Sequence, residues 1–196
     1  MNTAAPRNVY WRPWDEPGLE HLHVTFAAEG VRAIGLILRK LGDAHLRCRY
    51  ELETDATFRT RKLSFAVMPS GGSAGNRLAL ESDGDGHWRV NGEPRPDLAG
   101  CLEPDIQISP FTNTLPIRRL DLEAGAGADI RVVYVPLPDL TPRAADQRYT
   151  CLKKLGASGG RYRYDDAHWK FTAELPVDAD GLVTDYPELF ERVWPT

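Results

Sequence analysis

The chain has 196 residues, of which 42% are hydrophobic and 27% charged, a composition that is typical of globular proteins and argues against disorder. Its length fits one large β domain, residues 1–196. The net charge of −4, with arginines spread along the chain, argues against a nucleic-acid-binding protein, which usually carries a basic surplus.

The cysteines and the N-terminus bear on the compartment in which the protein works. Cys48, Cys101 and Cys151 form neither a disulfide framework nor a zinc-ligand pattern, and such cysteines suit a reducing cytosol. Residues 1–10 lack the apolar stretch of a secretory signal, and no apolar run approaches the roughly 20 residues that span a bilayer. We therefore expect a cytoplasmic protein without a membrane span.

Alternation of apolar and polar residues, which is typical of strands with one buried face, runs through most of the chain. It is clearest at residues 46–53, where Leu46, Cys48, Tyr50 and Leu52 are interleaved with charged residues. The pattern predicts strands at 9–14, 21–28, 31–39, 46–53, 61–68, 77–82, 87–90, 105–108, 118–122, 130–135, 147–153, 161–165, 169–175 and 182–185.

Turn residues and one short helix complete the predicted elements. Asn91-Gly92 and Asp180-Gly181 supply the positive φ angles of tight turns. A helix is expected at 187–193, because Pro187 suits a first helical turn. Residues 31–38 are apolar on both faces, which predicts a strand covered on both sides, with Gly35 allowing a bend or a close approach. The fold class is all-β, or β-rich with one or two short helices, in an antiparallel sandwich or barrel.

Several motifs with chemical potential are better explained as turns or surface residues. His21 and His23 share one strand face, but the sequence indicates no further metal ligand. Asp83-x-Asp85-Gly86 and Asp178-x-Asp180-Gly181 lack the bidentate Glu of calcium loops. No helix follows Gly71-Gly72-Ser73, as a nucleophile elbow requires. We predict no metal, no cofactor and no catalytic residue.

The most unusual segment is Pro-Phe-Thr-Asn-Thr-Leu-Pro-Ile-Arg-Arg-Leu at residues 110–120. Its two prolines stiffen the chain and favour extended angles at Ser109 and Leu115. Thr112, Asn113 and Thr114 between them offer both hydrogen-bond donors and acceptors.

Arg118 and Arg119 are adjacent on the strand predicted at 118–122, so one of them faces inward if the sheet curls. A buried guanidinium needs an anionic partner, either Asp105 or an acidic group of a ligand. Two interpretations stay open. In the first, Thr112–Thr114 satisfy local backbone groups and the inward arginine pairs with Asp105. In the second, the loop and the arginine line the mouth of a ligand cavity.

Beyond these residue patterns, the sequence resembles a bacterial family of putative glycolipid-binding proteins, formerly a domain of unknown function, over nearly the whole chain. The resemblance is carried above all by residues 110–120, and further by Gln147-Arg148-Tyr149-Thr150 and by Trp88. It implies a single curved antiparallel sheet that forms an incomplete barrel, similar in shape to bacterial lipoprotein carriers, around a cavity suited to a lipid or glycolipid. Ser109 departs mildly from the family pattern.

We therefore expect a carrier or sensor for a small amphiphile, with an acyl chain in an apolar barrel interior. The alternative is an enzyme that uses a buried carboxylate, for which Asp105, Glu20 and Glu51 are candidates. A third possibility is an interaction module without a cavity. The indole rings of the five tryptophans also suit sugar faces, although core packing explains most of them. The candidate ligand-binding residues are Asp105, Phe111, Thr112, Asn113, Thr114, Arg118, Arg119, Trp88, Gln147 and Tyr149.

Overall fold

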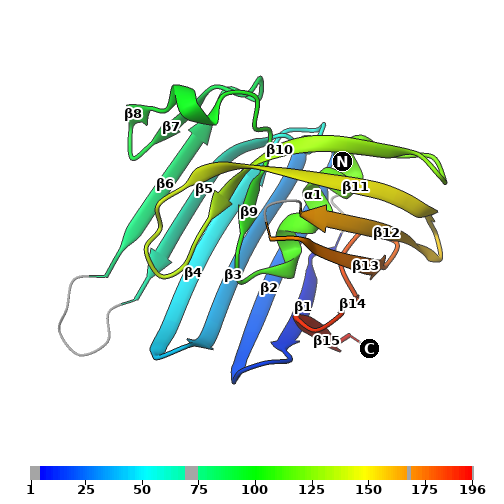
Figure 1. Cartoon of the computed structure of the whole chain (residues 1–196), viewed down its shortest axis with the longest axis horizontal. Coiled ribbons are helices and arrows are strands. Elements are labelled where there is room, and N and C mark those ends of the chain that lie inside the picture. Colours follow the sequence, from blue (N-terminus) through cyan, green and yellow to red (C-terminus); the bar gives the residue numbers. More distant parts are fainter. Residues whose placement is uncertain (1–4, 69–74, 167–168, 196) are drawn as a thin grey trace.

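The computed structural model describes residues 5–68, 75–166 and 169–195, and in this part of the chain two β-sheets pack face to face (Figure 1). The large sheet is antiparallel and has ten strands. Their order is β14 (Asp185–Tyr186), β15 (Phe190–Trp194), β1 (Arg7–Pro13), β2 (Gly18–Ala27), β3 (Gly30–Leu41), β4 (Ala44–Thr54), β5 (Thr60–Val67), β6 (Arg77–Ser82), β7 (Trp88–Val90) and β8 (Glu93–Pro94).

The small sheet has five strands and curls across one face of the large one. Its order is β13 (Phe171–Val177), β12 (Gly159–Asp166), β11 (Arg143–Gly156), β10 (Gly127–Val135) and β9 (Pro104–Ile106), with β9 parallel to β10. The expected single antiparallel sheet is therefore wrong, because the chain divides its strands between two sheets. The β-rich class with one short α-helix is confirmed, and two 3₁₀ turns, η1 (Pro96–Leu98) and η2 (Pro110–Asn113), accompany it.

The period-two pattern correctly predicts which face of a strand is buried. Leu46, Cys48, Tyr50 and Leu52 of β4 face the core, and the charged residues between them face outward. Asn91 and Gly92 both have positive φ and form the predicted tight turn between β7 and β8. The predicted turn at Gly71-Gly72-Ser73 lies outside the described residues.

The strand β3 departs from the expectation that both of its faces are covered. Val31, Ala33 and Ile37 are buried, whereas Leu36 and Leu38 are 45% and 56% exposed on the outer face. The close approach at Gly35 is confirmed, because a Cβ atom there would lie 2.0 Å from the Tyr50 ring.

Two elements were predicted wrongly in type. The strand expected at 118–122 is the end of helix α1 (Thr114–Leu120), which follows η2 and ends where Asp121 adopts a left-handed conformation. Leu115 is consequently helical, and Pro116 fits because the first helical turn needs no N–H donor. The helix expected at 187–193 is replaced by β15, whose pairing with β1 outweighs the local helix signal.

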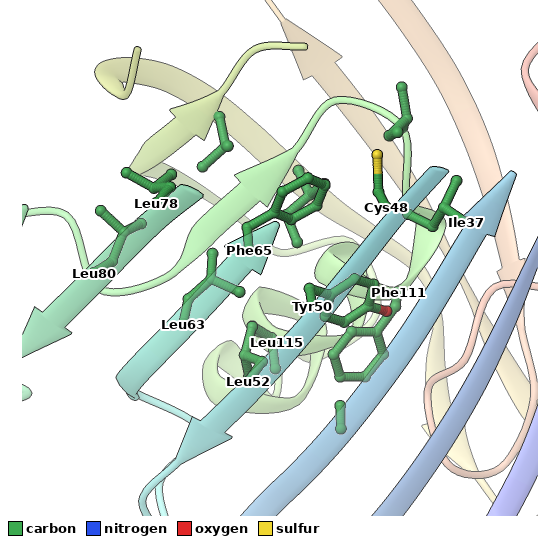
Figure 2. Close-up of a cluster of buried hydrophobic side chains, with 14 of the residues drawn as sticks. Ile37, Cys48, Tyr50, Leu52, Leu63, Phe65, Leu78, Leu80, Phe111 and Leu115 are labelled. Atoms are coloured by element: carbon green, nitrogen blue, oxygen red, sulfur yellow. The ribbon is translucent and has the colours of Figure 1, made fainter. Parts of the chain in front are cut away.

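Two hydrophobic cores lie on the inner faces of the sheets. The first fills the space between the large sheet and the segment from β9 to α1, and Figure 2 shows Phe111 and Leu115 of that segment beside Tyr50 and Leu52 of β4. The Tyr50 ring stacks at 6.3 Å from both Phe65 and Phe111. The second core joins Ile117 of α1 to the small sheet and the C-terminal strands. In the described part of the chain, no helix is long and apolar enough to cross a membrane.

Candidate ligand-binding site

A partly open cavity of about 410 Å³ lies between the sheets, and we call it the inter-sheet cavity. Its walls come from the inner face of the small sheet (β10, β12 and β13), from the C-terminal strands β14 and β15, and from the end of β3. Residues 105–109 and Asn113 form a further wall, and Asp15, Trp169 and Leu189 complete the lining. The cavity therefore depends on segments that are far apart in the sequence.

Two carboxylates line the cavity from strands of the small sheet, and Asp15, between β1 and β2, is a third. Asp105 of β9 accepts hydrogen bonds from Gln147 Nε2 at 2.6 Å and from Thr112 Oγ1 at 3.4 Å. Asp166 is the last residue of β12. Its carboxylate accepts hydrogen bonds from the Tyr164 hydroxyl at 3.4 Å and from the backbone N–H of Trp169 at 3.0 Å. Desolvation raises the pKa of Asp105 to about 6, against the lowering effect of its hydrogen bonds with Gln147 and Thr112.

The cation of the cavity is Arg39, whose side chain is almost completely buried. Its Nη2 donates to both oxygens of Asp15, at 2.8 and 3.0 Å, and its guanidinium lies 5.7 Å from the centre of the Phe190 ring. Its Nε has no hydrogen-bond partner among the residues that the structure describes. Arg39 therefore lines the cavity as a cation that Asp15 already pairs.

Aromatic rings form much of the wall. Tyr164, Phe171 and Tyr186 lie within 6.1–6.3 Å of one another, and Phe190 is 6.3 Å from Tyr186. Tyr134 and Trp169 extend this surface. Such rings offer flat apolar faces together with hydroxyl and indole donors.

A buried polar triad lies behind the cavity wall. Ser109 lines the cavity, and its Oγ donates to Glu20 Oε1 at 2.7 Å. The Tyr50 hydroxyl donates to the same oxygen at 2.7 Å. Desolvation raises the pKa of Glu20 to about 7, although both hydrogen bonds oppose the rise. Of the carboxylates considered from sequence, Glu20 and Asp105 are desolvated, whereas Glu51 is exposed on the outer face.

The predicted ligand-binding residues fall into three groups. Asp105 and Asn113 line the cavity. A second group lies behind the wall and forms hydrogen bonds with these two residues. Tyr149 donates to Asn113 Oδ1 at 2.7 Å, and Thr112 and Gln147 donate to the Asp105 carboxylate. The third group lies away from the cavity and contains Phe111, Thr114, Arg118, Arg119 and Trp88.

The two arginines do not occupy opposite strand faces, because they lie on α1. Arg119 forms a bidentate ion pair with the buried Glu103, at 2.7 and 2.9 Å, so the expected pairing of an inward arginine with Asp105 is wrong. Arg118 lies over the rings of Phe58 and Phe26, at 4.8 and 5.6 Å from their centres. A helix places residues 118 and 119 about 100° apart, so each finds a different neighbour.

The local interpretation of residues 112–114 holds for two of the three. The Thr112 hydroxyl lies within 3.3 Å of the Ser109 carbonyl, and Asn113 donates to the Pro110 carbonyl at 3.2 Å. Thr114 instead donates to the distant carbonyl of Gly181. These contacts position the segment and leave Asn113 at the cavity wall.

The other motifs behave as surface and turn residues. His21 and His23 both contact Asn8 Oδ1, at 3.0 and 3.1 Å. Within the described ranges, no group of three or more His, Cys, Asp or Glu residues is placed to hold a metal ion. The Asp83 and Asp178 side chains accept backbone N–H groups within their own turns.

The cavity residues that the sequence did not predict include Asp166, Arg39, Tyr186 and Phe190. The signal for Asp166 was present, because it continues the alternation of Tyr162 and Tyr164 and so belongs on the buried face of β12. Arg39 likewise continues the alternation of Val31, Ala33 and Ile37 on the buried face of β3, whereas Tyr186 and Phe190 lie in short strands that local alternation did not predict.

The similarity of this chain to known proteins extends over almost its whole length. Residues 8–192 match the model of a family described as "Putative glycolipid-binding". A crystal structure of a DUF1089 family protein from Pseudomonas aeruginosa is similar with a TM-score of 0.75 and 36% sequence identity. The similarity covers 93% of this chain and 95% of that chain. No curated protein matches the sequence.

Proposed function

The chain belongs to the family described as "Putative glycolipid-binding", and we propose on this basis that its inter-sheet cavity binds the polar head group of a glycolipid or a similar amphiphile. The observation that carries the proposal is the combination of aromatic rings with carboxylates and a guanidinium in one cavity. The carboxylates of Asp105 and Asp166 can accept hydrogen bonds from the hydroxyl groups of a ligand, and the guanidinium of Arg39 can donate to them. A sugar offers hydroxyl groups that do both.

The aromatic wall supports the same ligand class. Tyrosine and phenylalanine rings pack against the C–H faces of sugars, and the tyrosine hydroxyl groups can form hydrogen bonds at the ring edge. Tyr164, Phe171 and Tyr186 form a continuous surface of this kind.

We place the head group, and not the acyl chain, in the cavity. The interior between the large sheet and α1 is occupied by side chains such as Tyr50, Phe65 and Phe111. Leu41, Ile106 and Leu189 add apolar surface to the cavity wall, and this surface suits the first carbons of the acyl chain. The rest of the acyl chain would extend out of the open side of the inter-sheet cavity.

The test is binding of n-octyl β-D-glucoside, below its critical micelle concentration, to the full chain by calorimetry and native mass spectrometry. Phe171→Ala is expected to weaken binding by about tenfold, because it removes a stacking ring from the wall. The matched control is Tyr10→Ala, which removes a half-buried ring from the outer face and should leave binding unchanged. Absence of binding to the wild-type chain, or equal binding to both variants, would refute the proposal.

A second candidate is an enzyme that acts on a glycosyl substrate in the same cavity. It is favoured by one observation, that Asp105 and Asp166 both reach the cavity and the pKa of Asp105 is raised to about 6, as a general acid requires. Incubation of the full chain with n-octyl β-D-glucoside distinguishes the two functions. Release of free glucose that is lost in Asp105→Asn would indicate catalysis, whereas a ligand that stays intact indicates a binding protein.

A further inference from the structure

We propose that the inter-sheet cavity prefers a head group that carries a protonated amine over neutral and anionic head groups. The inference rests on the proposed function and specifies its ligand class. It reverses the expectation from sequence that Arg118 or Arg119 binds an acidic head group, because both arginines lie outside the cavity.

The charges on the cavity wall carry the first step. Three carboxylates, Asp15, Asp105 and Asp166, line it together with one guanidinium, that of Arg39. Asp15 already binds Arg39 at 2.8 Å. Two negative charges therefore remain for the ligand, and the cavity attracts cations.

The two remaining carboxylates have neutral partners. Asp105 binds the amide of Gln147 and the hydroxyl of Thr112, and Asp166 binds a hydroxyl and a backbone N–H. Among the described residues, no ion pair joins either carboxylate to a cation. A carboxylate as buried as Asp166, which is 6% exposed, normally has a charged partner. A ligand ammonium group would supply that partner for both.

Gln147 connects the two carboxylates. It lies directly across from Asp166 in the pairing of β11 with β12, and its amide donates to Asp105 at 2.6 Å. Both carboxylates thus belong to one wall, and one ligand group can approach both. Desolvation of Asp105, which raises its pKa to about 6, agrees with a negative charge that lacks a cation in the free protein.

The aromatic wall favours the same charge. The faces of Tyr164, Phe171 and Tyr186 are electron-rich and attract a cation that lies over them. Rings combined with carboxylates are a typical environment for ammonium groups. A phosphate, sulfate or carboxylate head group would meet both the rings and the carboxylates with unfavourable electrostatics.

Three octyl glycosides that differ in charge test the preference, namely the 2-amino-2-deoxyglucoside, the glucoside and the glucuronide. Their affinities for the full chain are compared by calorimetry at pH 7 and low salt, below their critical micelle concentrations. We expect the amino glycoside to bind at least tenfold more tightly than the glucoside, and the glucuronide to bind most weakly. If the glycosides bind with equal affinity, the charge preference is overturned while the proposed function stands. If none binds, both fail.

Variants locate the preference. Asp166→Asn is expected to reduce the ratio of amino glycoside to glucoside affinity to below about threefold, with Asp105→Asn as a second variant should the first fold poorly. The matched control is Asp165→Asn, which removes the same charge from the neighbouring residue of β12 on the opposite face and should retain the ratio. An equal loss in Asp165→Asn would show a general charge effect and would overturn the assignment to the cavity.

Discussion

At the scale of single residues, the folded chain holds an ionisable group in an unfavourable environment at Glu20. The side chain is 2% exposed, accepts two hydrogen bonds on Oε1, and has no partner for Oε2 among the described residues. Burial raises its pKa from 4.5 to about 7. The folded state therefore holds a proton that the unfolded chain has released between these two pH values, so this group stabilises the fold most below pH 4.5 and loses that contribution as the pH rises through 7.

Glu20→Gln should remove this pH dependence. The shift corresponds to a loss on the order of 3 kcal/mol in the free energy of unfolding between pH 4.5 and 8.5. We expect urea denaturation to show a smaller decrease from pH 5 to pH 8.5 in Glu20→Gln than in the wild-type chain. The quantity compared is the change in the free energy of unfolding between the two pH values, because the buried amide of Gln lowers this free energy by the same amount at both. The control is Glu51→Gln on the exposed face of β4, which should decrease in stability as the wild type does. If Glu20→Gln also loses as much stability as the wild type between the two pH values, the prediction is wrong.

At the scale of the element, β3 shows how much strand parity decides. Ile37 faces the first core and is 2% exposed, whereas Leu38 beside it is 56% exposed and pairs with Leu19 on the outer face. Both are aliphatic residues on the same strand, so their composition and local propensity hardly differ. Their contributions to stability should differ because only one removes its side chain from water.

Ile37→Ala should lower the free energy of unfolding by about 2–5 kcal/mol, and Leu38→Ala by less than about 1 kcal/mol. Chemical denaturation of the two variants under identical conditions measures both values. The two variants serve as controls for each other, because each removes the same number of aliphatic carbons from adjacent positions of one strand. Equal losses would mean that the outer face of β3 is covered in solution.

At the scale of the whole molecule, the segment from β9 to α1 connects the two cores. Ile106 and Phe111 pack in the first core, while Ile117 packs in the second. The buried ion pair of Arg119 with Glu103 fixes α1 against the chain that precedes β9. Because one short segment contributes to both cores, we predict that the chain unfolds as one cooperative domain.

Leu175→Ala tests this cooperativity, because Leu175 lies in the second core and Trp11 and Trp88 report on the first. The substitution should destabilise the protein by about 2–5 kcal/mol, and tryptophan fluorescence should follow the same shifted transition as far-ultraviolet circular dichroism. A fluorescence midpoint that stays at the wild-type value while the dichroism becomes biphasic would indicate two independent units.

The local sequence alone determined most of the strands, their buried faces and one tight turn. Alternation at Leu46–Leu52 identified the core side of β4, Asn91-Gly92 identified a tight turn, and Gly35 marked the approach of Tyr50. Each depends on neighbouring residues and on the two-residue period of a strand, so a sequence displays it directly. Residues 110–120 also carried the family resemblance, and they brought Asp105 and Asn113 into consideration for the site.

Only the tertiary structure decided which segments meet. The pairing of β15 with β1 overrode a local helix signal, and the packing of Ile117 and Leu120 turned an apparent strand into α1. The cavity itself joins Asp105, Asp166 and Arg39 from three strands in two sheets. Contacts of this kind depend on the burial gained when distant segments pack together, and no local period in the sequence encodes that gain.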